Sequence, residues 1–158
     1  MHDGKLKPRM DGPEHYKLAP ETSAALMALG KAVDDSGLEK PLTELVKLRV
    51  SQINGCAYCV QLHLNVARKL GVAAAKLEQT VVWRETGVFS VRERAALQWA
   101  EALTLMAGRG VPDAAFEEVS SQFDRSELAF LTAAVANINA WNRIAGSLHY
   151  TPPASTAA

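Results

Sequence analysis

The chain has little cysteine and no surplus of charge of either sign. Only two of its 158 residues are cysteines, Cys56 and Cys59, which are too few and too close together for the disulfide framework of a small secreted domain. Basic and acidic residues number 17 each, so the net charge is +0, and the basic residues are scattered along the sequence. This composition makes no electrostatic case for a nucleic-acid partner or for an anionic membrane partner.

Long apolar runs are also missing. The first residues are polar and lack the apolar segment of a signal peptide, and no uninterrupted apolar stretch is long enough to span a bilayer. We therefore expect a cytoplasmic protein that makes no membrane contact. The length favours one domain over residues 19–150, preceded by an extended arm over 1–18, where Pro8, Gly12 and Pro13 interrupt any periodicity, and followed by a loose tail over 151–158.

The sequence also lacks strand patterns, because no segment alternates apolar and polar residues between hairpin turns. The 3.6-residue helical period recurs instead, and Ser90 with Glu93 and Asp124 with Glu127 are spaced as helix-starting capping boxes. The sequence predicts an all-α fold with helices over residues 20–35, 41–53, 56–70, 73–85, 90–106, 112–123 and 127–148. The last of these is apolar almost all round, so we expect it to be central or to lie at a subunit interface.

The two cysteines lie at the start of one predicted helix, with His63 four residues after Cys59. At about 100° per residue the three side chains share the apolar face of that helix, whereas Asn65 projects from the polar side. Cys56 falls in the first turn, where unpaired backbone N–H groups and the helix dipole favour a thiolate. We expect Cys56 to be the more accessible thiol, and Cys59 to lie deeper and closer to His63.

The C-x-x-C spacing indicates redox chemistry or a metal site, although two inert buried thiols are a third interpretation. A thioredoxin-type pair belongs beside a βαβ unit, and the sequence predicts none. Structural zinc takes four ligands, and Cys56, Cys59 and His63 supply only three, so we expect no metal. Periodicity alone makes Glu44 a solvated carboxylate opposite its helix's apolar stripe, while Arg49 lies within that stripe and needs a carboxylate or interface partner.

Glu44, Cys56, Cys59 and His63 have the spacing Glu-x11-Cys-x2-Cys-x3-His, which resembles the active-site pattern of the alkylhydroperoxidase D family in the wider carboxymuconolactone decarboxylase-like superfamily. The surrounding text LVKLRVSQINGCAYCVQLH is similar to that family's core signature, as are VVWRETGVFSVRERAALQWAEALT and INAWNRIA. The resemblance implies an all-α bundle with the C-x-x-C at the N-terminus of a central helix, assembled as a homo-oligomer, a trimer or hexamer. Tyr58 departs from the pattern, because the best-known members carry a second histidine there.

The resemblance further implies a thiol peroxidase that reduces hydrogen peroxide or organic hydroperoxides without metal, haem or flavin. In that family pattern Cys59 is the attacking thiol, Cys56 resolves it, and Glu44 with His63 forms a proton relay. A dithiol or thioredoxin-like donor would recycle the pair. One alternative is a carboxymuconolactone decarboxylase-type lyase with His63 as its acid–base residue, although such enzymes do not need the cysteine pair. Another is a non-catalytic redox sensor or disulfide adaptor.

Overall fold

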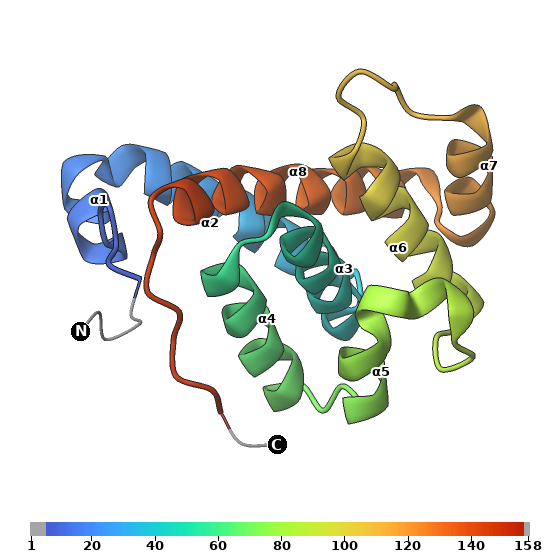
Figure 1. The fold of residues 1–158 in the computed structure, drawn as a ribbon. Helices are drawn as coiled ribbons and strands as arrows, with labels where there is room; N and C mark the ends of the chain where they lie inside the picture. Colours follow the sequence, from blue (N-terminus) through green and yellow to red (C-terminus); the bar gives the residue numbers. More distant parts are fainter. Residues whose placement is uncertain (1–5, 157–158) are drawn as a thin grey trace.

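The computed structural model describes residues 6–156, which form helices joined by turns and contain no strand (Figure 1). The all-α prediction is therefore confirmed. Among these residues no helix is long and apolar enough to cross a membrane. The helices are α1 (Gly12–Leu18), α2 (Pro20–Asp34), α3 (Lys40–Asn54), α4 (Ala57–Lys69), α5 (Ala74–Gln79), the 3₁₀ helix η1 (Thr80–Glu85), α6 (Val91–Thr104), α7 (Asp113–Gln122) and α8 (Arg125–Ser147).

Helix α8 is the central element of the fold, and it contacts α2, α3, α4, α6 and α7 (Figure 1). Leu131, Val135 and Ile138 from α8 join Val46 and Val50 from α3 in the main apolar core. The apolar character of α8 is thus accounted for inside one chain. It gives no separate argument for a subunit interface.

Helix α3 is packed on several sides, because it contacts α4, α6, α8 and η1. The residues from Leu42 to Val46 are consequently all buried, whichever way they point from the helix axis. The expected partner of Arg49 is Glu101 on α6, whose carboxylate accepts from the guanidinium at 2.7 Å and also from Trp83 Nε1 at 2.9 Å and from Arg84.

The expectation of an extended arm over residues 1–18 is wrong from Gly12 onward, where α1 begins. The Asp11 side chain caps this helix by accepting the Glu14 N–H at 2.8 Å. Pro13 lies in the first turn, where its missing N–H leaves no helical hydrogen bond unmade. Proline breaks a helix when it lies in the interior, but Pro13 lies at the start, where it is compatible with the helix. Residues 1–5 of the expected arm lie outside the described part of the chain.

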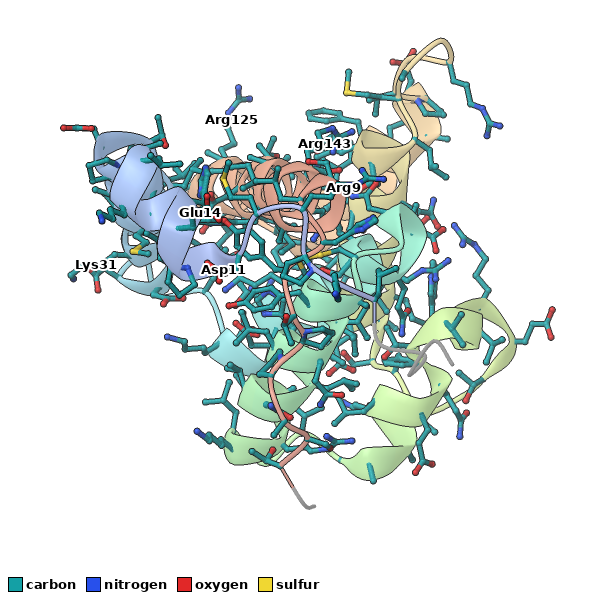
Figure 2. The ribbon with its side chains drawn as sticks, turned by 60° about the vertical axis from the view of Figure 1, so that its left-hand side comes forward. Arg9, Asp11, Glu14, Lys31, Arg125 and Arg143 are labelled. Carbon is teal, nitrogen blue, oxygen red and sulfur yellow. A yellow bond between two sulfur atoms is a disulfide. The ribbon has the colours of Figure 1, made fainter. Side chains whose placement is uncertain are left out.

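Both ends of the described chain are held against helices. The Arg9 guanidinium donates to the Ser147 carbonyl at 3.0 Å, at the end of α8 (Figure 2). Residues 151–156 form no helix, but they pass alongside α4, where Asn65 Nδ2 donates to the Ala154 carbonyl at 2.8 Å and Asn65 Oδ1 accepts the Thr156 N–H at 3.1 Å (Figure 1). The expectation of a loose tail is therefore wrong over this stretch. Asn65, predicted on a polar face, is only 8 % exposed because the segment covers it.

Candidate functional site

The turn between α3 and α4 positions the cysteine pair. Gly55 ends α3 in the left-handed conformation at φ 67°, and the Cys56 N–H closes the turn on the Ser51 carbonyl at 3.1 Å. Cys56 is the N-cap residue of α4, and its Sγ accepts the Cys59 N–H at 3.3 Å. Cys56 and Cys59 form a disulfide with their Cα atoms 5.3 Å apart. The pair thus lies at the N-terminus of α4, as the sequence predicts.

Neither sulfur faces open solvent, since Cys56 is 1 % exposed and Cys59 is 2 % exposed. Ala145 and Tyr150 pack around the disulfide, and the Tyr58 ring meets the Tyr150 ring edge-on with centroids 5.4 Å apart. The expectation that Cys56 is the more accessible thiol is therefore wrong. A position near the start of a helix exposes a side chain only when no other element covers it, and here the last turn of α8 does.

Glu44 and His63 are brought together by the packing of α3 on α4. Glu44 Oε2 lies 2.7 Å from His63 Nδ1, and Lys47 Nζ donates to Glu44 Oε1 at 2.8 Å. Glu44 is only 2 % exposed, so its placement as a solvated carboxylate is wrong. A single apolar stripe predicts one buried face, whereas α3 is covered on several faces.

Burial raises the pKa of Glu44, but hydrogen bonds and charge from His63 and Lys47 outweigh burial, and the net pKa lies below its usual range. Glu44 is therefore an anion at neutral pH. An ionised carboxylate only accepts hydrogen bonds, so the His63 Nδ1–H donates to it. The other ring nitrogen, Nε2, is left to exchange a proton elsewhere.

A cavity of about 260 Å³ lies between α2, α4 and α8, and Cys59, His63 and Lys47 form part of its wall. The rest of the wall is mainly apolar and includes Leu26, Met27, Leu62, Ile138 and Trp141. Cys56 is not on this wall. Lys47 was missed by sequence reasoning, although its position three residues after Glu44 is a spacing at which helical side chains pair.

The described residues contain no group of three or more histidine, cysteine, aspartate and glutamate side chains placed to hold a metal ion. Asn54, at the end of α3, is instead tied to α8: its Nδ2 donates to Asn139 Oδ1 at 3.0 Å and to Asn142 Oδ1 at 2.9 Å. Asn142 in turn donates to Ser51 Oγ at 3.0 Å. These amide bonds fix the turn that carries Cys56 to the central helix.

A protein-family model described as "Carboxymuconolactone decarboxylase family" matches residues 20–102, just over half of the chain, and this stretch includes Glu44, Cys56, Cys59 and His63. The chain belongs to the carboxymuconolactone decarboxylase family. The family assignment agrees with the resemblance seen in the sequence, and the solved relatives below identify the fold as AhpD-like.

Proteins of unknown function are among the relatives to which this chain is similar. YdfG of Bacillus subtilis, an uncharacterised protein, is 35 % identical over 130 residues that cover 82 % of this chain and 88 % of YdfG. A crystal structure of a protein of unknown function from Agrobacterium tumefaciens, described as a candidate antioxidant defence protein AhpD, is 40 % identical, covers 94 % of this chain and 100 % of its own, and has a TM-score of 0.88. The debrominase Bmp8 shares the fold, with a TM-score of 0.78, 20 % identity and coverage of 87 % of this chain and 74 % of its own.

Proposed function

We propose that the protein is a thiol-dependent peroxidase that reduces organic hydroperoxides or hydrogen peroxide with Cys59 and Cys56. The observation that carries the proposal is that His63, hydrogen-bonded to the ionised Glu44, lies with Cys59 on the wall of one apolar cavity. A nucleophilic thiol needs a base to remove its proton and a partner to orient that base. The family membership and the AhpD-like relative add support.

In the reduced protein, His63 Nε2 takes the proton of Cys59, one helical turn away, and Glu44 stabilises the imidazolium through Nδ1. The Cys59 thiolate attacks one peroxide oxygen, so that an S–O bond forms as the O–O bond breaks. The departing alkoxide or hydroxide takes the proton from His63 and leaves as an alcohol or water. Cys59 is then a sulfenic acid.

Cys56 completes the turnover. The Cys59 N–H and the start of α4 favour a thiolate at Cys56. This thiolate attacks the sulfur of the Cys59 sulfenic acid, and the S–S bond forms as the S–O bond breaks. The proton released by Cys56 joins the departing hydroxide, which leaves as water. The product is the disulfide found in the structure. The apolar cavity wall suits the organic group of a hydroperoxide, and Lys47 balances the charge of Glu44 at its edge.

The test measures peroxide consumption by the fully reduced protein, with cumene hydroperoxide as substrate and dithiothreitol as reductant. Wild-type protein is expected to consume many equivalents per subunit, and Cys59→Ser none. Cys56→Ser, reduced and then freed of dithiothreitol, is expected to consume one equivalent and to carry a dimedone-trappable sulfenic acid on Cys59, identified by mass spectrometry. A sulfenic acid on Cys56 in Cys59→Ser, with none on Cys59 in Cys56→Ser, would reverse the two roles. Consumption of a single equivalent by the wild type in excess reductant would favour the redox sensor instead.

A further inference from the structure

A second cavity, of about 280 Å³, lies beside the cysteine pair and is lined by both sequence neighbours of Cys56. Its wall also includes Gly146 and His149 at the end of α8. Tyr58 and Ala145 line both this cavity and the cavity at Cys59, and therefore lie between the two. Each sulfur thus has its own cavity nearby.

Gly146 lies between this second cavity and Cys56. A Cβ added at Gly146 would meet Cys56 Cβ at 3.6 Å and Cys56 Sγ at 3.9 Å, which are ordinary contact distances. Alanine would therefore fit, and it is the better helix former, so packing and helix stability both favour a side chain here. What the glycine provides is the space of one methyl group beside Cys56, next to its Cβ and Sγ.

His149 occupies a backbone conformation that usually belongs to glycine. The end of α8 is closed by the His149 N–H on the Gly146 carbonyl and the Tyr150 N–H on the Ala145 carbonyl, with His149 at φ 56°. Two other helices of the chain close with the same pair of bonds, and there the left-handed residue is a glycine, Gly55 at φ 67° or Gly71 at φ 76°. A histidine in the left-handed region is less stable than glycine. His149, held in this less stable conformation, is one of the residues that line the second cavity.

Gly146 and the left-handed His149 each lower the stability of the fold, and both residues line the second cavity. Residues that cost stability and gather in one place are expected at a functional site. We propose that the second cavity is the entry site of the reductant, a small dithiol that reaches Cys56 past Gly146 while His149 accepts its proton. The inference rests on the proposed peroxidase function, because a cycling peroxidase must have its disulfide reduced. It separates the two half-reactions in space, with peroxide at Cys59 and reductant at Cys56.

His149 takes the proton of the first thiol, and the resulting thiolate attacks Cys56 Sγ. A new S–S bond joins the reductant to Cys56 as the Cys56–Cys59 bond breaks, and Cys59 leaves as a thiolate. The second thiol of the reductant then loses its proton and attacks the reductant's own bound sulfur, which releases Cys56. Two electrons pass to the protein, the dithiol becomes a cyclic disulfide, and the two protons end on the cysteines.

A small reductant suits the site better than a protein thiol. Cys56 is buried, so the sulfur of a cysteine on another protein's surface would stop short of it unless the last turn of α8 opened. A free dithiol of a few heavy atoms fits within the cavity volume.

Tyr58 on α4 and Tyr150 after α8 are the other ionisable residues on the wall that His149 lines. Arg9 donates to the Ser147 carbonyl nearby, and Asp11 acts on Tyr150. Burial, with smaller contributions from neighbouring tyrosines and Asp11, raises the pKa of Tyr150 to about 12, so its phenol stays neutral over the range tested below.

The first experiment locates the attacked sulfur without any peroxide. The disulfide form is treated with glutathione, quenched at intervals with excess N-ethylmaleimide, and digested for mass spectrometry. We expect glutathione on Cys56 and the maleimide on Cys59; the opposite labelling would overturn the proposal. If the protein is not a peroxidase, this result is unaffected, so the two proposals fail separately.

The second experiment follows reduction of the disulfide by dithiothreitol in Gly146→Ala and Gly146→Leu, with Gly87→Ala as the matched control at a glycine with open space around it. We expect Gly146→Leu to slow reduction at least tenfold, Gly146→Ala to be intermediate, and the control to match wild type. Equal rates in Gly146→Leu and the control would overturn the proposal. Faster reduction by thioredoxin than by dithiothreitol at equal dithiol concentration would overturn the choice of a small reductant.

His149→Gly separates chemistry from stability. Relief of the left-handed strain should raise the melting temperature, so a purely structural residue would give a more stable protein with unchanged reduction rates. We expect reduction at pH 7 to be at least tenfold slower, with the deficit closing near pH 9, where dithiothreitol is itself largely a thiolate. Added imidazole should restore part of the rate at pH 7. A higher melting temperature with a wild-type rate at pH 7 would overturn the role given to His149.

Discussion

Glu44→Gln is the sharpest single test of the proton relay. The substitution keeps the shape of the side chain but removes the charge that faces His63 Nδ1 at 2.7 Å and Lys47 Nζ at 2.8 Å. A hydrogen bond to a charged group contributes about 1.5–3 kcal/mol, and each 1.4 kcal/mol is about tenfold in rate. If that stabilisation acts on the imidazolium formed as Cys59 loses its proton, the oxidation step should slow by roughly 10- to 150-fold.

The assay is a single turnover, in which the reduced protein is mixed with excess cumene hydroperoxide and free thiols are trapped at intervals. Glu101→Gln is the matched control, since Glu101 is a buried carboxylate with cationic partners, Arg49 and Arg84, outside the cysteine cavity. Both variants should lose stability, because each leaves half-buried cationic partners without their carboxylate. Only Glu44→Gln should lose oxidation rate.

Two outcomes would refute this reasoning. A Glu44→Gln rate within threefold of wild type would mean that His63 works without the carboxylate or takes no part. An equal slowing in Glu101→Gln would mean that the rate reports general loosening of the fold. Lys47 is 16 % exposed at its side chain, so its ammonium can reach water in Glu44→Gln and the fold should survive the change.

Three further predictions concern stability and assembly. Glu44 and Glu101 have pKa values below the ordinary 4.5 in the folded protein, so the stability they contribute is complete above that pH and is lost as the pH falls through the lowered values. The melting temperature should therefore fall steeply below about pH 4.5. The fall should be smaller in the double variant Glu44→Gln/Glu101→Gln. Asn65→Ala should cost about 1–3 kcal/mol and speed amide hydrogen exchange in residues 151–156, whereas Gln61→Ala should change exchange there little. Light scattering at micromolar concentration should give a trimer or hexamer, as the family resemblance implies, and a monomer would contradict this.

The sequence predicted the helical class, most helix positions and the start of α4, because these depend on local signals such as capping boxes and left-handed glycines. It placed Arg49 correctly by the same logic: a cation in an apolar stripe needs a carboxylate, and Glu101 supplies it. The error over α1 was also local. Pro13 alone predicts an interruption, but with Asp11 before it the same residue starts a helix.

The candidate site was less predictable, because its environment is made by elements distant in sequence. Glu44 is buried since α3 is covered on several faces, and Asn65 is buried since residues 154–156 return to α4. Cys56 is covered by the end of α8, far along the chain. Periodicity describes one helix at a time and carries no information about the elements that pack against it.

The cover that α8 places over the disulfide also has a consequence for the newborn chain. Translation delivers α4 first, and the segment between Cys59 and Tyr150 takes roughly 5–20 s to synthesise at ordinary elongation rates. Throughout that interval the helix that will shield the sulfurs does not yet exist. Both thiols therefore pass through a period of open exposure on the ribosome, and a thiol-directed label applied in a pulse should distinguish nascent chains from finished ones.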